Sequence, residues 1–326
     1  MRSYSRIAVI SSLLSLVTPG SAAAQSIYPE KPIRMVLGFG TGGPQDTVAR
    51  LLGQKFTEAW GKPVVIDNAT GAGGAIAAGR VAKAAPDGYT LGLMTDASLV
   101  ISPSLRQVAY DPTKDFAPVS QVTLSPIMLV VHDAVPATSV SELVALAKAQ
   151  PGALSFASAG IGSTTHMAAE LFKSVAGIDI WHVPYKGVGV GLALTDLLGG
   201  RVTMAFSPLT SALPVVREGK LRAIAVTTLR RSSVVRDVPT IAESGYEGFE
   251  VALSYGLFAP AKTPAEIVRK LHLETGKALA LPELRARLAD LGLEGVGSSP
   301  DKYAAFIRSE IPKWAKVIAD AGIKSN

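Results

Sequence analysis

The chain has 326 residues, a formal net charge of +6 and an apolar fraction of 48%. Its Lys and Arg residues are dispersed and form no basic stripe interleaved with aromatic residues, which argues against a nucleic-acid partner. No cysteine is present, so disulfides, thiolate nucleophiles and thiolate metal sites are excluded.

The first 24 residues have the pattern of a signal peptide. Arg2 and Arg6 precede an apolar stretch at 7–17, and small residues ending at Ala24 form an A-x-A cleavage site. At about 1.5 Å per residue, this stretch covers only about half of a ~30 Å hydrocarbon core, which argues against a membrane anchor. We expect export, with cleavage after Ala24.

Apolar runs then alternate with amphipathic helical patterns. In the first part of the chain we expect strands at 33–39, 63–67 and 89–95, and helices at 46–60 and 75–85. The glycine loop at 71–74 fails the G-x-G-x-x-G dinucleotide pattern, because Ile76 occupies the third glycine position. We interpret that loop as a tight turn.

The alternation continues through the middle of the chain and changes near its end. Strands are expected at 127–131, 154–159, 180–183, 202–206 and 223–227, with helices at 139–150 and 164–175. A strand at 251–258 is followed by three helical patterns that begin at or near Pro, at 264–280, 282–291 and 300–321. Repeated β-α-β units predict mostly parallel sheets flanked by helices, with the last helices packed on a sheet as a clasp.

Two sheets of similar size predict two lobes joined by two crossings, near 116–126 and 227–233. Beyond the signal peptide at 1–24, we assign residues 26–125 plus 229–326 to lobe one and 126–228 to lobe two. Two crossings form a hinge, which suits a protein that closes around a ligand.

Two loops between a strand and a helix are the candidate binding site, because open α/β sheets bind ligands outside the carboxyl ends of their strands. In the first glycine loop, 39–46, bare glycines would expose backbone N–H groups beside a helix start. Asp46 there either contacts the ligand or caps the helix. In the second loop, 157–166, Ser163 is a helix cap, a ligand contact or both, and His166 is expected to be structural.

Catalytic and metal motifs are missing from the sequence. Ser158 has Phe156 where a G-x-S-x-G motif needs glycine, and the histidines lack H-x-x-x-H spacing. We therefore expect no catalytic residue, no metal and no cofactor. The alternative is a hydrolase or acyl-transfer enzyme that uses Ser158 or Ser163, although no base lies near either serine in the sequence.

Nine short motifs occur in an order that resembles the Bug receptors, the periplasmic solute-binding proteins of tripartite tricarboxylate transporters. They are F-x-x-G-G-x-x-D at 39–46, N-x-x-G-A-G-G at 68–74, P-D-G-Y at 86–89, G-S-x-x-H at 162–166, H-V-P-Y-K-G at 182–187, L-G-G at 198–200, R-A-I-A-V at 222–226, V-P-T-I-x-E-x-G at 238–245 and A-P-x-x-T-P at 259–264. Each motif is weak alone, but together they cover essentially the whole mature chain.

The resemblance implies a type II-like periplasmic-binding-protein fold, with a small organic acid or related metabolite held between the lobes. It also implies a periplasmic monomer that works with membrane permease subunits; a receptor that signals to a sensor kinase is the alternative. No Arg or Lys lies in either loop, so the grip should suit one carboxylate rather than a tricarboxylate cluster.

Residue by residue, the resemblance implies ligand contacts in three groups. The first loop supplies Phe39, Gly40, Thr41, Gly42 and Gly43, with Asp46 as a further candidate; the second supplies Ser158, Gly160, Ser163, Thr164 and Thr165; and Thr95, Tyr185 and Ser207 are wall residues. Gly38 stands where the family usually has proline, which predicts a more mobile or differently aimed start of the first loop.

Overall fold

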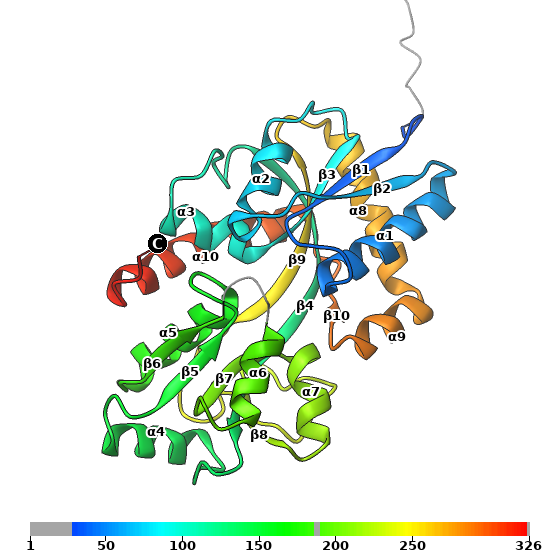
Figure 1. Ribbon diagram of the computed structural model, residues 1–326. Helices are drawn as coiled ribbons and strands as arrows, with labels where there is room; N and C mark the ends of the chain where they lie inside the picture. The colour runs from blue at the N-terminus through cyan, green and yellow to red at the C-terminus, as the bar shows by residue number, and fades with distance from the viewer. Residues whose placement is uncertain (1–27, 186–189, 325–326) are drawn as a thin grey trace, which may run out of the picture.

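Two α/β lobes share one long strand in the computed structural model, which describes residues 28–185 and 190–324 (Figure 1). The shared strand β4 (Phe116–His132) pairs with β9 (Ala252–Pro260) in its first part and with two lobe-two strands in its second part. The predicted α/β class with two flanked sheets is confirmed. The predicted signal peptide lies outside the described residues.

The lobe-one sheet has parallel strands at its outer edge and antiparallel strands where the lobes join. Its order is β2-β1-β3-β9-β4, with β10 also pairing β4. The parallel strands are β1 (Ile33–Leu37), β2 (Val64–Asn68) and β3 (Thr90–Thr95), and the short strand is β10 (Glu294–Gly295).

Helices cover both faces of this sheet, which explains why its strands are apolar on both sides. Met35 and Leu37 pack towards α1 (Pro44–Trp60), α8 (Ala265–Ala280) and α9 (Pro282–Asp290). Val36 packs in the opposite core, which includes residues of α2 (Ala75–Ala82) and α10 (Pro300–Asp320). Short helical turns complete this side: η1 (Ala72–Gly74), η2 (Ala97–Ile101) and α3 (Ser102–Leu105).

Lobe two repeats the arrangement. β7 (Met204–Pro208), β5 (Ser155–Ser158) and β6 (Trp181–Pro184) run parallel to one another, and β4 pairs antiparallel with both β7 and β8 (Leu221–Val226). Leu129 of β4 packs in the core of α4 (Val140–Ala149) and α5 (Thr164–Ala176). Its neighbour Val130 packs in the opposite core, with residues of α6 (Val190–Leu198) and α7 (Leu209–Arg217).

Thr227 joins the two segments that cross between the lobes. Its backbone N–H donates to Ile127 O at 2.9 Å, and its carbonyl accepts from the Val251 N–H at 2.9 Å. Its hydroxyl lies 3.0 Å from Ile127 O and 2.6 Å from Val251 O, and accepts from the Ile127 N–H at 3.1 Å. One buried threonine therefore ties the outgoing chain to the returning chain.

Residues 229–251, which the sequence analysis assigned to lobe one, pack against lobe two. Thr240 forms a bridge with Val226, at the end of β8. The Phe172 ring of α5 lies 5.9 Å from the Tyr246 ring and 6.3 Å from the Phe249 ring. We therefore propose that the chain crosses near residues 126 and 251, and that lobe one resumes at β9.

The terminal helices pack on lobe one, and α10 also touches α5 of lobe two. The largest differences from the expected elements are the helical turns at 97–105, the helix α7 and the length of β4. Pro118, Pro126 and several polar residues make the first half of β4 resemble a loop in sequence, but β9 and β10 pair with it on both sides. Within the described residues, no helix is both long and apolar enough to cross a membrane.

Candidate functional site

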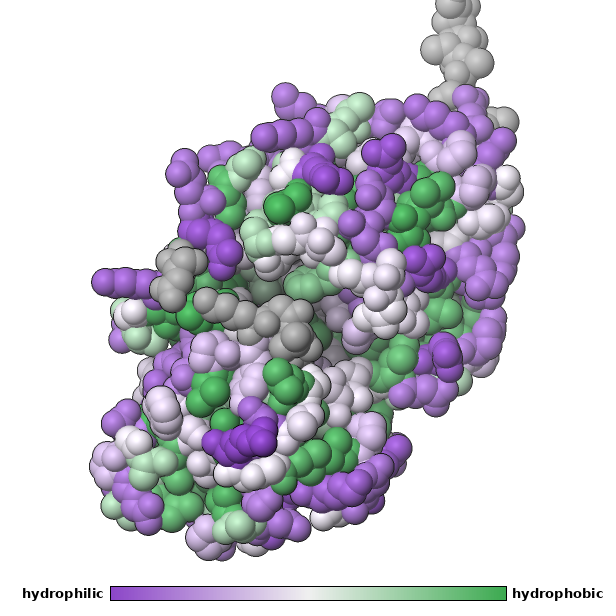
Figure 2. All heavy atoms as spheres, in the orientation of Figure 1, coloured by the Kyte–Doolittle hydropathy of each residue, from purple (hydrophilic) through white to green (hydrophobic). Residues whose placement is uncertain are grey.

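A cleft of about 570 Å³ lies between the two lobes, and Figure 2 shows the hollow on the face drawn. The residues that line this interlobe cleft come from both lobes and from the returning strand β9. They are Phe39, Gly40, Thr41, Gly43, Pro44, Gln45, Thr95, Ala97, Ala159, Ser163, Thr164, Thr165, Pro208, Thr210, Ser211, Leu253 and Tyr255.

Asp46 shapes the first glycine loop from behind. Its carboxylate accepts from the Gly42 N–H at 3.0 Å and pairs with Arg50 Nε at 2.8 Å. Asn68, at the end of β2, donates to Phe39 O at 2.8 Å and to Asp46 Oδ1 at 3.3 Å. The Arg50 guanidinium holds the pKa of Asp46 below its usual range. The Asp46 carboxylate is thus buried and already bonded to Gly42 and Arg50, and Asp46 does not line the cleft.

Gly38 is required for packing at the start of this loop. A Cβ at position 38 would lie 2.5 Å from Gly74 Cα. The backbone before the first glycine loop therefore touches the backbone of the glycine loop at 71–74. Gly42 has a φ of +80°, which favours glycine. Gly38 therefore brings the start of the first glycine loop into contact with the loop at 71–74.

The second loop is ordered by hydroxyl groups that cap α5. Ser163 Oγ donates to Gly160 O at 2.7 Å and accepts from the His166 N–H at 3.2 Å. Thr165 Oγ1 accepts from the Ala159 N–H at 3.0 Å and lies 3.0 Å from Ser163 Oγ. Ser163 is therefore a helix cap that also lines the cleft. Thr164, the first residue of α5, also lines the cleft.

Two stacked histidines support the second loop from the lobe-two core. The His166 and His182 rings are 4.0 Å apart, and His166 Nδ1 accepts from the Gly162 N–H at 3.2 Å. Burial lowers the pKa of His166 to about 3 and that of His182 to about 4, so both rings are neutral near pH 7. The expectation that His166 is structural agrees with these contacts.

The structure places a base beside Ser158, which the sequence spacing did not indicate. His182 Nε2 lies 2.6 Å from Ser158 Oγ, and this oxygen also accepts from the Gly160 N–H at 3.1 Å. However, Ser158 is fully buried and does not line the cleft. The Ser158–His182 pair therefore supports the second loop from within lobe two.

Eight of the predicted ligand contacts line the cleft, and six do not. Those that line it are Phe39, Gly40, Thr41, Gly43, Thr95, Ser163, Thr164 and Thr165. Those outside the lining are Gly42, Asp46, Ser158, Gly160, Tyr185 and Ser207.

Tyr185 and Ser207 are turned away from the cleft. The Tyr185 hydroxyl donates to Asp196 Oδ2 at 2.7 Å, and Tyr185 packs against the core beneath α6 and α7. Ser207 is fully buried within β7. We therefore propose that neither residue contacts the ligand directly and that β7 contributes to the lining through Pro208, the residue after Ser207.

Several residues that line the cleft were not among the predicted ligand contacts. Thr210 and Ser211 open α7, which was not expected, and Leu253 and Tyr255 lie on β9. The alternation of residues 253 and 255 on a recognised strand could have indicated the latter pair. Gln45 also lines the cleft, and its Nε2 donates to Leu93 O at 2.8 Å.

The cleft is polar without being charged. None of the described lining residues is Asp, Glu, Lys, Arg or His. Instead, the first turns of α1, α5 and α7 all contribute to the lining, through Gln45, Thr164 and Thr210 among others. First-turn N–H groups have no partner within their own helix and carry a partial positive charge, so this arrangement attracts an anion.

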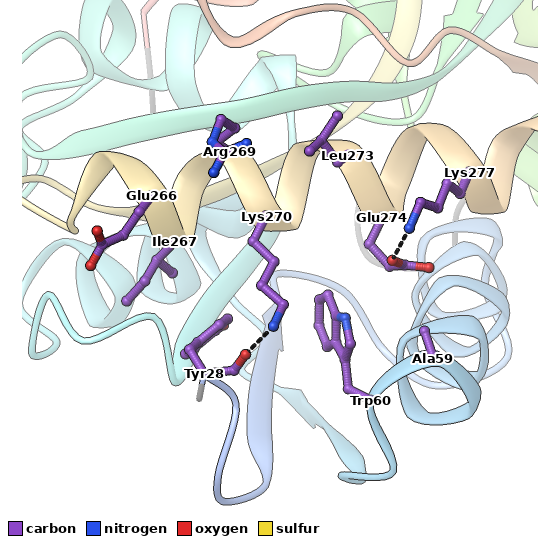
Figure 3. A pocket seen from close by; sticks show the side chains of 10 residues that line it. All are labelled: Tyr28, Ala59, Trp60, Glu266, Ile267, Arg269, Lys270, Leu273, Glu274 and Lys277. Atoms are coloured by element: carbon purple, nitrogen blue, oxygen red, sulfur yellow. Dashed lines mark hydrogen bonds and ion pairs between the residues drawn. The ribbon is translucent and has the colours of Figure 1, made fainter. Parts of the chain in front are cut away.

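A second hollow, of about 640 Å³, lies on lobe one between α8 and the end of α1 (Figure 3). Trp60 and Lys270 line it, and Lys270 Nζ donates to Tyr28 O. It shares no lining residue with the interlobe cleft. Elsewhere in the described residues, no group of three or more His, Asp or Glu side chains is arranged to hold a metal ion.

Comparisons with known proteins show the family to which the chain belongs. The family model for "Tripartite tricarboxylate transporter family receptor" matches residues 48–323. Protein BugT of Bordetella pertussis is 37% identical over 313 residues, covering 95% of this chain and 95% of that protein.

Two solved structures from Rhodopseudomonas palustris are also similar. One, solved with adipate, is 37% identical, has a TM-score of 0.79, and matches over 91% of this chain and 99% of its own. The other, MatC with bound malate, is 37% identical, has a TM-score of 0.76, and matches over 89% of this chain and 100% of its own. The chain therefore belongs to the Bug-type family of tripartite tricarboxylate transporter receptors.

Proposed function

We propose that this receptor captures a small carboxylate in the interlobe cleft and delivers it to a membrane permease. The convergence of three helix N-termini on an uncharged, hydroxyl-rich cleft supports this proposal most directly. A carboxylate can be held there by backbone N–H groups of α1 and α5 together with the Thr41 and Thr164 hydroxyls.

The ligand class is a short dicarboxylate. One carboxylate would meet the starts of α1 and α5, and the other would face the start of α7 beside Tyr255. Adipate and malate, found with the similar structures, have this chemistry. The helix starts supply partial positive charge for two carboxylates in this arrangement. A third anionic group would find no cationic side chain in the lining, so we expect at most two.

The experiment is a calorimetric titration with adipate, malate, acetate and citrate on the wild type, Thr210→Gln and Thr210→Glu. We expect one of the dicarboxylates to bind best. The Glu variant should lose about a hundredfold in affinity or more, because two like charges near 4 Å cost several kcal/mol at a protein surface. The Gln variant should bind within about tenfold of the wild type. Equal affinity of the Gln and Glu variants would contradict the assignment of α7 to the anion site.

The receptor acts without catalysis in this proposal. The observation that favours an enzyme is the contact between Ser158 and His182, but Ser158 is enclosed and its oxygen is engaged. Hydrolysis of p-nitrophenyl acetate should be the same for the wild type and Ser158→Ala. A rate that falls to background in the variant would revive the enzyme hypothesis.

The protein should work as a monomer in the periplasm, after cleavage behind Ala24. The N-terminal pattern and the family membership support this location. N-terminal sequencing of the native protein should begin at Gln25. Deleting the permease should abolish uptake of the bound solute; intact uptake with a lost transcriptional response on deleting the receptor would favour the signalling alternative.

A further inference from the structure

Asp96 is a buried carboxyl group placed directly behind the interlobe cleft. Its neighbours Thr95 and Ala97 line the cleft, whereas Asp96 lines a separate rear cavity of about 200 Å³. Thr164, at the start of α5, lines both spaces. Thr95 and the start of α5 therefore separate the Asp96 side chain from the ligand space.

The side chains that hydrogen-bond to Asp96 are uncharged, and the cation in the same cavity, Lys313, acts on it only at longer range. Ser254 Oγ donates to Asp96 Oδ1 at 2.7 Å, and the Tyr303 hydroxyl approaches the same oxygen at 3.5 Å. Tyr303 reaches this position over Gly256, where a Cβ would collide with the phenol ring. Asp96 is 5% exposed, and it takes part in none of the ion pairs among the described residues.

The charged groups around the rear cavity come from α10 and from the returning crossing. Glu310 and Lys313 of α10 line the cavity, together with Glu250. Lys313 Nζ is already engaged, with Glu310 Oε1 at 3.0 Å and Glu250 O at 2.8 Å, and Trp314 Nε1 donates to Glu310 Oε2 at 2.8 Å. The nearest cation is thus shared with another carboxylate.

These surroundings leave Asp96 balanced between its charged and neutral forms. Burial raises the pKa of Asp96 to about 7; the hydrogen bond from Ser254 opposes the rise, and the negative charge of Glu310 adds to it. A second anion placed in the cleft would disfavour the charged form further, because like charges repel more strongly in a poorly solvated interior.

We propose that Asp96 is a proton-binding site coupled to the interlobe cleft, so that the receptor takes up a proton when it binds a carboxylate anion. The proton and the carboxylate bind at different places, but their binding is coupled. The proton removes the negative charge of Asp96, which would otherwise repel the solute. The inference rests on the proposed function, because it requires an anionic ligand.

The two stacked histidines of lobe two do not compete with this assignment. His166 and His182 have pKa values of about 3 and about 4, because burial disfavours their charged forms. Neither ring changes protonation near pH 7. The second carboxyl group of a simple dicarboxylate titrates at about pH 5 to 5.5, so a proton taken up above about pH 7 is bound by the protein and, by this proposal, by Asp96.

The test is calorimetric titration with adipate or malate from about pH 6 to 8.5, in pairs of buffers with different ionisation enthalpies. If binding raises the Asp96 pKa by about one unit, about half a proton is taken up per complex near pH 7.5. Affinity should then be about tenfold higher at the acidic end than at the alkaline end. Thermal melting checks that each variant is folded.

Two variants assign the proton. Asp96→Asn should bind the probe with no proton uptake and with an affinity independent of pH. Ser254→Ala, which removes a hydrogen bond to the charged form, should keep the uptake but move it to higher pH. If Asp96→Asn does not fold, the shift in Ser254→Ala still tests the assignment.

Each failure has a different signature. If neither dicarboxylate binds at any pH, the proposed function is wrong. If a probe binds with no proton uptake over the whole range, or if Asp96→Asn keeps the uptake, the inference is overturned. It is also overturned if affinity depends on Na⁺ rather than on pH, because the rear cavity would then hold a metal cation.

Discussion

At the scale of single residues, Gly162 shows how closely the lobes approach beside the cleft. It has a φ of +77°, and a Cβ there would lie 2.4 Å from Leu105 Cδ1 of lobe one. The second loop and helix α3 therefore touch where glycine leaves room. This contact explains why the glycine-rich sequence of the second loop matters beyond ligand access.

We expect Gly162→Ala to destabilise the protein by more than Gly177→Ala. Both positions have positive φ, which costs about 1–2 kcal/mol for alanine, but a Cβ at Gly177 meets only open space. The collision with the terminal methyl of Leu105 should add up to about 1 kcal/mol, because that flexible side chain can move aside. Urea unfolding measures the difference, and adding Leu105→Ala should restore part of the loss. Equal destabilisation by the two glycine substitutions would show that the lobes do not meet at Gly162.

Asp46 is the residue whose role changes most between sequence and structure. Its folded-state pKa is lowered, first by Arg50 and then by the backbone N–H of Gly42 and by Asn68. Its contribution to stability is therefore present above the ordinary Asp pKa of about 4, and is lost as the pH falls through the lowered folded-state value.

We expect Asp46→Asn to lower the free energy of unfolding by about 1–2 kcal/mol at pH 7, because Gly42 loses a charged acceptor. The gap to the wild type should shrink below about pH 4. Asp320→Asn, which removes a surface pair with Lys316, is the control and should have little effect. A gap that widens in acid would contradict the assigned role.

At the scale of elements, the hinge depends on two strands held by one side chain. β4 carries the chain out of lobe one, and Thr227 bonds both to its Ile127 and to Val251, just before β9. Helix packing reinforces this joint, because α10 contacts β4, η2 and α5. Motion between the lobes must therefore bend β4 and β9 rather than separate them.

We expect Thr227→Val to lower stability by about 1–3 kcal/mol, because it leaves buried backbone groups at the crossing without a partner. If the substitution destabilises the closed form relative to the open form by about 1 kcal/mol, the affinity for the solute should fall about fivefold. Thr275→Val is the matched control: its hydroxyl bonds to Leu271 O within α8 and lies away from the hinge. The control should melt lower but keep its affinity. A similar affinity change in both variants would argue against a hinge role for Thr227.

At the scale of the whole molecule, neither lobe alone completes the binding site. The lining combines the first glycine loop of lobe one with the second loop and α7 of lobe two. A ligand that bonds to both sides will favour the closed arrangement, because it gains contacts only there.

We expect saturating ligand to reduce the radius of gyration measured by small-angle scattering. A folded mature chain of this length should have a radius of gyration of about 19 Å in compact form. Thr210→Glu, which should bind about a hundredfold more weakly, provides the control and should show no compaction at a ligand concentration that just saturates the wild type. An unchanged radius with bound ligand would mean that the cleft is already closed before binding.

The amino-acid pattern by itself determined the architecture of this protein. Its apolar runs alternate with helical stripes, and glycines and prolines mark where elements end; these are local properties, so strands such as 33–37 and helices such as 44–60 could be predicted closely. Both loops of the cleft were found for the same reason, because a strand end followed by glycine and a helix start is a local signal.

Only the tertiary structure decided which side chains face the ligand space. Asp46 and Ser158 looked available in sequence, but Arg50 and His182, which bond to them, are brought there by a helical turn and by a neighbouring strand. Likewise, nothing local distinguishes Asp96 from an exposed acid; its burial comes from β9 and α10, more than 150 residues later in the chain. Burial and pairing depend on contacts between distant segments, and these contacts exist only once the two lobes have folded together.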